Sequence, residues 1–234
     1  MSMMYPGFFE HQHRSVHSEQ LSGVWNAIVT DNKDPDKQGR VKVKFPLREG
    51  DLQTDWIRVA TMMAGKEMGT LFIPEVNDEV LVAFMMGRLD QPVVIGALWN
   101  AKDKPPAPND KNDIRKIKTR SGHEIIFDDN SSNGGVTVKT KAGHSIVLSD
   151  KDKSIKLETE NKQQSVELDG SGNKIVVKSG SMSTVEMNGQ GDVKIDAKKS
   201  ISIKGVQVKI EADGMLEIKT NGVLTLKGSM VKIN

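Results

Sequence analysis

The second half of the chain repeats one simple pattern of apolar and polar positions. From Val136 to Ile233, two apolar residues separated by a single position are followed by a short polar stretch, and this unit occurs twelve times. Residues at positions i and i+2 face the same side of a β-strand, so each unit predicts a short strand with one apolar face. The pairs are Val136/Val138, Ile146/Leu148, Ile155/Leu157, Val166/Leu168, Ile175/Val177, Val185/Met187, Val193/Ile195, Ile201/Ile203, Val208/Ile210, Leu216/Ile218, Leu224/Leu226 and Val231/Ile233.

The spacing of these units changes along the region. Successive pairs begin nine to eleven residues apart up to Val185, and seven or eight residues apart beyond it. Glycine occurs in eight of the eleven gaps, which predicts a tight bend after almost every strand. The pattern therefore predicts a looser upper part and a regular lower part of one repetitive β-structure.

A strand with only two apolar side chains cannot form a core by itself, because it buries too little apolar area to offset the entropy of ordering. Either one chain coils as a solenoid, or three chains wind together so that their strands alternate on each face of a triangular prism. The region contains no proline and no aromatic residue, which favours a narrow aliphatic interior and the trimer. The predicted trimer core comprises Val193, Ile195, Ile201, Ile203, Val208, Ile210, Leu216, Ile218, Leu224 and Leu226.

Residues 21–100 show a different pattern, with short strands between turn signals. All eight prolines and nine of the ten aromatic residues lie at or before Pro108. Several short strands at this spacing indicate a small barrel or sandwich. The predicted strands are Gly23–Thr30, Arg40–Pro46, Asp55–Thr61, Thr70–Ile73, Glu79–Phe84 and Val93–Leu98.

Four ordered stretches of this region resemble the OB-fold domain of contractile-tail spikes, the phage baseplate assembly protein V and VgrG group. They are Asp34–Val43, Trp56–Val59, Ile73–Val82 and Asp90–Asn100. The eight-residue period of the lower repeats likewise resembles the triple-stranded β-helix of phage and type VI secretion spikes. The expected fold is all-β, with an N-terminal OB-fold barrel followed by an intertwined trimeric β-helix that forms a needle.

The expected domain organisation follows from these boundaries. A stretch rich in proline, lysine and aspartate separates the barrel from the repeats and predicts a stiff linker. The segments are an N-terminal extension at 1–20, the OB-fold domain at 21–100, the linker at 101–113, a neck hairpin at 114–135 and the shaft at 136–234.

The resemblance implies a structural role as the central spike of a contractile injection machine. Three barrels would dock on a baseplate hub protein, with the N-terminal extension as a second candidate for hub contact. The needle would contact a target membrane only transiently, while it pierces the envelope. Assembly is expected in the cytoplasm, as part of a phage-tail-like particle that can be released outside the cell; the type of contractile system stays open.

The end of the chain implies a further partner. Some spikes of the resembled family bind iron at the tip through a His-x-His motif, but no histidine follows His144 here. The final apolar pair would leave a blunt apolar end, so we expect a small tip protein of the PAAR-repeat type to cap it. The expected contact residues are Val231, Lys232, Ile233 and Asn234.

Two other classes of function fit the sequence less well. The residues supply no defensible catalytic constellation, so we expect no enzyme, no catalytic residue, no cofactor and no metal site. The barrel alone also allows an OB-fold nucleic-acid-binding module with a β-solenoid tail. However, residues 1–135 hold 17 basic and 19 acidic residues, whereas such a module needs a basic groove. Trp25, Trp56 and Trp99 are therefore interpreted as core or interface residues.

Overall fold

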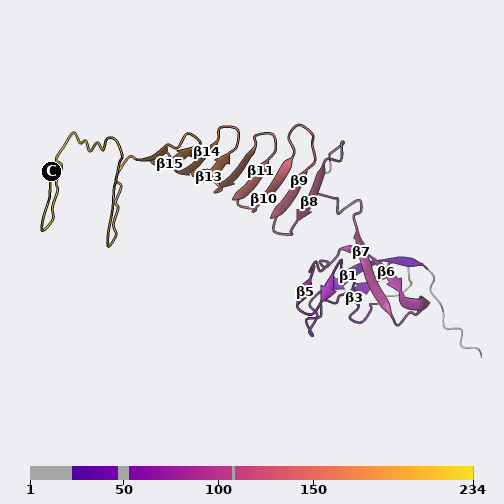
Figure 1. Cartoon of the computed structure of the whole chain (residues 1–234). Helices are drawn as coiled ribbons and strands as arrows, with labels where there is room; N and C mark the ends of the chain where they lie inside the picture. Colours follow the sequence, from indigo (N-terminus) through magenta and orange to yellow (C-terminus); the bar gives the residue numbers. More distant parts are fainter. Residues whose placement is uncertain (1–22, 47–52, 107–108, 234) are drawn as a thin grey trace, which may run out of the picture. The chain divides into compact units, whose positions relative to one another are not determined.

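The computed structural model describes residues 23–46, 53–106 and 109–233. The chain divides into two compact units, the first ending at residue 108 and the second beginning at Asn109. Figure 1 shows strands in both units, and the only helical element among the described residues is a 3-10 turn at Met85–Gly87. The all-β fold class expected from the sequence is thus confirmed.

The first unit is a small, strongly curved sheet. Its strands are β1 (Val24–Asp31), β2 (Lys42–Lys44), β3 (Arg58–Val59), β6 (Glu79–Phe84) and β7 (Pro92–Leu98), in the spatial order β2-β1-β6-β7-β3. The edge strands approach each other through a bridge between Val41 and Ile57, which closes the sheet into a barrel. The parallel pairing of β3 with β7 completes the OB-type arrangement.

Alternating side chains of these strands form the core of the barrel. Along β6, every second residue is buried and the intervening ones are half-buried, as expected for a strand with one face turned inward. The buried set is almost entirely aliphatic: Ala27, Val29, Val41, Val43, Ile57, Val80, Val82, Phe84 and Val94. Trp25, Phe45, Val59 and Ile73 pack against it.

One predicted strand of the barrel is wrong. Residues 70–73 form no strand, and the chain instead makes a short hairpin from β4 (Ala64–Gly65) and β5 (Met68–Gly69). Pro74 follows directly and offers no backbone donor, while Gly69 adopts a φ of 147°. A Cβ at that position would lie 2.4 Å from the carbonyl oxygen of Met63, so the hairpin requires glycine there.

The second unit contains one antiparallel sheet of nine strands in chain order (Figure 1). Each strand pairs with the one before it and the one after it, so the sheet is a simple meander. The strands are β8 (Ile114–Lys118), β9 (Glu124–Asp128), β10 (Gly135–Lys139), β11 (Ser145–Ser149), β12 (Ser154–Glu158), β13 (Gln164–Asp169), β14 (Lys174–Ser179), β15 (Ser183–Asn188) and β16 (Val193–Ala197). The hairpin expected as a neck forms the first two strands of this sheet.

The register of the meander aligns the apolar pairs. Val136 lies opposite Leu148, Leu148 opposite Ile155, and Ile155 opposite Leu168. The second members of the pairs align in the same way, for example Val138 with Ile146. The seven pairs from Val136/Val138 to Val193/Ile195 thus build two parallel apolar ladders on one face of the sheet.

The strand pairing changes at residue 198. Within the described part of the chain, residues 199–233 form no strand, although they carry the last five apolar pairs. Figure 1 accordingly draws this segment, from brown to yellow, without strand arrows. Neighbouring strands of one chain pair directly from β8 to β16, so strands of other chains cannot alternate with them there. The alternation of three chains that the sequence predicts therefore does not apply to β10–β16, and for residues 199–233 it stays a prediction.

Candidate functional site

One side of the nine-stranded sheet is apolar along its whole length and uncovered. The two ladders contribute 17 side chains, most of them between 37% and 64% exposed. We call this surface the apolar face. It comprises Phe127, Val136, Leu148, Ile155, Leu168, Ile175, Met187 and Val193 in one ladder, and Ile117, Ile125, Val138, Ile146, Leu157, Val166, Val177, Val185 and Ile195 in the other.

The opposite side of the sheet carries charged residues that pair with one another, and a few apolar ones such as Val147 and the buried Val176. Lys156 lies across from Glu167, and Glu186 across from Lys194, as in favourable cross-strand pairs. Glu124, only 7% exposed, accepts ion pairs from Lys118 at 3.0 Å and Lys139 at 3.2 Å. The hydrogen bond from Lys118 is the main cause that lowers the pKa of Glu124 to about 2. This side is suited to water, which leaves the apolar face as the side that needs a partner.

Besides a smaller hollow of about 270 Å³ at Leu168, Ile175 and Met187, two larger grooves run along the apolar face. The larger, about 750 Å³, follows the ladder that contains Val138, Ile146 and Leu157 and is bordered by His123 and His144. The smaller, about 490 Å³, follows the other ladder and is bordered by Asp150 and Gly170. Both are open troughs lined by branched aliphatic side chains, a surface that matches another apolar sheet rather than a small polar ligand.

The predicted trimer-core residues fall into two groups. Val193 and Ile195 lie at the end of the two ladders, where they are 64% and 56% exposed. The other eight lie beyond residue 198, and the structure does not bring them together on a strand. All eight are exposed: Ile201, Ile203, Val208, Ile210, Leu216, Ile218, Leu224 and Leu226.

The residues predicted to contact a tip protein are also exposed where they are described. Val231 is 53% exposed and Ile233 is 86% exposed, and Lys232 lies between them. Asn234 falls outside the described residues, as does the whole N-terminal extension at 1–20. The tip contact therefore stays a prediction.

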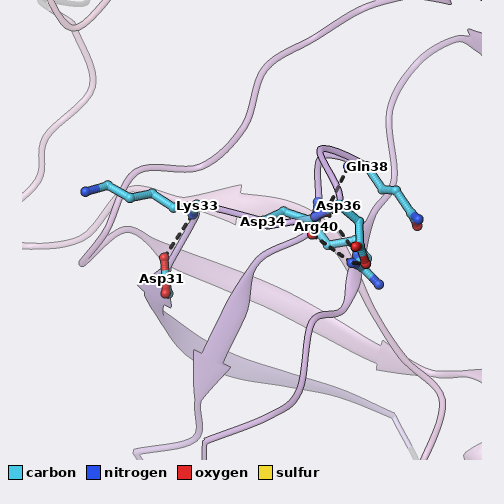
Figure 2. Close-up of polar contacts among 6 residues, drawn as sticks. All are labelled: Asp31, Lys33, Asp34, Asp36, Gln38 and Arg40. Atoms are coloured by element: carbon cyan, nitrogen blue, oxygen red, sulfur yellow. Dashed lines mark hydrogen bonds and ion pairs between the residues drawn. The ribbon is translucent and has the colours of Figure 1, made fainter.

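A buried carboxylate organises the turn between β1 and β2 in the barrel (Figure 2). The Asp34 side chain is 3% exposed and accepts hydrogen bonds from the backbone N–H groups of Asp36 and Gln38. Arg40 donates to the same carboxylate from Nε at 3.0 Å and from Nη2 at 2.7 Å. The Arg40 hydrogen bond is the largest cause that holds the pKa of Asp34 well below its usual range.

Asp34 is expected to make the barrel sensitive to acid. Its pKa is lower in the folded state than in the unfolded state, so its stabilising effect is complete above about pH 4 and is lost as the pH falls further. Asp34→Asn should lower the thermal midpoint at pH 7 by several degrees and flatten the dependence of that midpoint on pH below 4. Calorimetry of both proteins between pH 7 and 2 measures this, with Asp31→Asn as the control; parallel pH curves would contradict it.

Two further carboxylates of the barrel accept hydrogen bonds at the start of β6. The Asp78 carboxylate accepts from the backbone N–H of Glu75 at 2.8 Å, and Glu79 accepts from Asn26 at 2.9 Å and Asn100 at 3.0 Å. Asn77 adopts a φ of 78°, a left-handed conformation that asparagine tolerates better than most residues. These contacts explain the turn before β6 without any catalytic role.

Two exposed features of the barrel escaped sequence reasoning. The hairpin of β4 and β5 and its flanks carry Met62, Met63, Met68, Leu71 and Phe72, each more than 50% exposed. Of the three tryptophans, Trp25 packs on the core, and Lys42 lies 5.2 Å from the ring centre of Trp56, but Trp99 is 69% exposed. A run of methionines beside glycines carries no period of its own, so only the folded hairpin reveals the exposed patch.

Metal and membrane features are limited in the described structure. Among residues 23–46, 53–106 and 109–233, no three histidine or carboxylate side chains gather closely enough to hold a metal ion. Within the same ranges, no helix has the length and apolar character needed to cross a membrane. The prediction that the chain holds no metal stays a prediction.

The barrel of the first unit matches a family of known domains. Residues 25–99 match the family model described as the type VI secretion system/phage-baseplate injector OB domain. The chain therefore carries this injector OB domain, and its similarity to VgrG-like baseplate spike proteins rests on this part.

Individual relatives agree with this assignment. The chain is 38% identical over 107 residues to the type VI secretion system spike protein VgrG2a of Pseudomonas aeruginosa. The aligned region makes up 42% of this chain and 13% of that protein. It is 34% identical over 133 residues to the spike protein VgrG5 of the same organism, and the aligned region is 46% of this chain and 17% of VgrG5. The actin cross-linking toxin VgrG1 of Vibrio cholerae is 35% identical over 104 residues, covering 40% and 10%. The matched part is thus a small fraction of each relative's length.

Proposed function

We propose that this chain is the structural central spike of a contractile injection machine, and that three copies form its needle. The observation that carries the proposal is the uncovered apolar face of β8–β16, followed by a segment that repeats the same pattern without strands of its own. The relatives are named spike proteins, which supports the proposed role. The comparisons do not favour the alternative of a nucleic-acid-binding module.

Three copies account for the distribution of polar and apolar surface. Each nine-stranded sheet would form one wall of a three-sided prism, with its apolar face inward and its paired charges outward. An apolar stretch of 17 side chains is far larger than a soluble monomer normally exposes. A closed ring of three sheets would place the strand ends of each sheet against those of the next and remove the apolar face from water.

Beyond residue 198 the same logic requires interchain pairing. The backbone N–H and C=O groups of residues 199–233 need partners once they are buried, and their own chain supplies no strand ladder. Strands from the other two copies would supply the ladder, so the three chains wind around one another in the lower shaft. The proposed trimer core of Val193, Ile195 and the eight exposed residues beyond them would then fill the axis.

The proposed shaft is built to resist axial load. Nine strands spaced by about 4.8 Å span about 40 Å along the direction of stacking. Backbone hydrogen bonds between neighbouring strands point along that direction, so compression acts on a continuous ladder rather than on loops. This stiffness suits a needle that a contracting sheath drives through an envelope.

The remaining partners are also part of the proposal. The barrels would dock on the baseplate hub, and the methionine-rich hairpin around β4 and β5 gives them an exposed apolar surface. A tip protein would cover Val231 and Ile233. We propose no enzymatic activity for this chain itself, although one relative is named a toxin. That protein extends far beyond the part matched here.

Electron microscopy of the assembled particle tests this role. An antibody or gold label on the chain should mark the baseplate end of the particle on its axis, and cells without the chain should assemble no particle that delivers its cargo. Restoring the wild-type chain is the control. A label along the sheath, or particles that assemble and inject normally without the chain, would contradict the proposal.

A further inference from the structure

Two strands of the second unit begin with histidine and end with aspartate at the same spacing. His123 precedes β9 and Asp129 follows it, while His144 precedes β11 and Asp150 follows it. In both cases the aspartate lies six positions after the histidine. An even separation along an extended chain places both residues on the same side of the sheet, which here is the side of the apolar face.

The backbone ladder continues through these positions. The N–H of Thr119 donates to the carbonyl oxygen of His123 at 2.9 Å, and the N–H of Asp150 donates to that of Gly134 at 3.1 Å. The imidazoles border the larger groove, and Asp150 borders the smaller one. The apolar face is therefore framed by histidines along one edge and by aspartates along the other.

Each histidine is held in one orientation by a neighbouring turn. The backbone N–H of Lys141 donates to Nδ1 of His123 at 3.3 Å, and the N–H of Glu160 donates to Nδ1 of His144 at 3.2 Å. A neutral ring whose Nδ1 accepts a hydrogen bond carries its proton on Nε2. Nε2–H lies on the other side of the ring and is the donor left for a partner.

The aspartates supply matching acceptors. The Asp150 side chain is exposed and receives no hydrogen bond or ion pair from the described residues of its own chain. Asp129 receives Nη1 of Arg115 at 2.9 Å through one of its two oxygens, and its exposed carboxylate has capacity for further donors. The two edges are thus complementary, one with N–H donors and the other with carboxylates.

This complementarity rests on the proposed trimer, because the two edges of one chain cannot meet. Six residues of extended chain span about 20 Å, too far for contact between His144 and Asp150 of the same copy. In a closed ring, the starting edge of one copy meets the ending edge of the next, and symmetry places the same strand of every copy at the same height.

We propose that histidine and aspartate pair across each seam of the trimer, where the starting edge of one copy meets the ending edge of the next. His144 of one copy donates its Nε2–H to the Asp150 carboxylate of a second copy, and His123 pairs with Asp129 in the same way. Three identical seams give six such pairs, which set the vertical register of the three sheets. The equivalent positions on β13 are Gln164 and Gly170, so the charged pairing is confined to the first half of the sheet.

A double-mutant cycle tests the pairing on the purified full-length chain. His144→Asn keeps an acceptor near the position of Nδ1 but lacks the Nε2–H donor, and Asp150→Asn removes the charge. Each single variant should lower the thermal midpoint by about 3 °C. The double variant should lower it by no more than one single variant does. His123→Asn combined with Asp150→Asn, which pairs different strands, should give additive losses.

Cross-linking gives a second readout that does not depend on stability. The chain has no cysteine, so His144→Cys with Asp150→Cys introduces the only two thiols. A short bismaleimide should join neighbouring copies into dimers and trimers on a denaturing gel. Lys156→Cys with Asp150→Cys is the matched control, because Lys156 lies on the opposite side of the sheet, and it should remain monomeric on the gel.

The possible results separate this inference from the proposed function. The seam pairing would be overturned by any of three results: additive losses in the cycle, an unchanged thermal midpoint for His144→Asn, or equal cross-linking of the two cysteine pairs. If the solution mass were still that of a trimer, the spike proposal would remain. A monomeric mass for the wild-type chain would overturn both. Coupling between His144 and Asp150 with selective cross-linking would establish the pairing.

Discussion

Replacing Ile146 with glutamate should leave the chain unable to form a trimer. Ile146 lies in a ladder of the apolar face, so the substitution would place three carboxylates in the closed interior of the prism. An unpaired charge moved out of water costs several kcal/mol, and three of them exceed the stability of most assemblies. The solution mass should fall to that of one chain.

The neighbouring residue provides a matched control for this prediction. Val147 is also β-branched and apolar, but it lies on the opposite side of β11, across from Lys156 and Thr137. Val147→Glu should preserve the trimer, because its carboxylate can pair with Lys156. Equal behaviour of the two glutamate variants would show that the apolar face is not the assembly surface.

Deleting residues 199–234 should leave the nine-stranded sheet intact but make the trimer short-lived. In the proposed assembly this segment has only interchain hydrogen bonds. About ten such bonds at about 0.5 kcal/mol each amount to about 5 kcal/mol, so dissociation should accelerate more than about 1,000-fold. Subunit exchange between differently labelled trimers measures the rate, before and after the deletion.

A shorter deletion gives the control for that experiment. Removing only residues 231–234 takes away the final apolar pair and the proposed tip contact, so exchange should accelerate far less. If the deletion of residues 199–234 left the exchange rate unchanged, the lower segment would not be an interchain lock. In that case the account of residues 199–233 as an intertwined shaft would be wrong.

The repeat could be predicted because its signal is local. Each apolar pair, such as Ile155/Leu157, needs only the alternation of a strand to define its face, and glycine marks the bends. Which strands pair with one another cannot be predicted from a single repeat unit. The same pattern of apolar pairs forms an intrachain meander up to β16 but no intrachain strand pairing beyond residue 198. The shorter spacing after Val185 was the only sequence signal of that change.

The barrel shows a similar limit. Strand β6 was predicted with its observed bounds, because Glu79–Phe84 combines β-branched residues with a clear turn before it. The strand expected at residues 70–73 failed because backbone geometry at Gly69 and Pro74 decided the path of the chain. The histidine and aspartate edges were missed for another reason: the two edges lie about 20 Å apart on one chain, and only the register of the sheet shows that they frame one face.

In the proposed trimer, the apolar face of each copy is covered by the two other copies of this chain. The mass of the purified full-length protein in solution, measured by sedimentation equilibrium or light scattering, tests it most directly. A trimer has three times the chain mass of 25.7 kDa, about 77 kDa, and this is the expected result. A single species at 25.7 kDa that stays soluble with its apolar face exposed would contradict it.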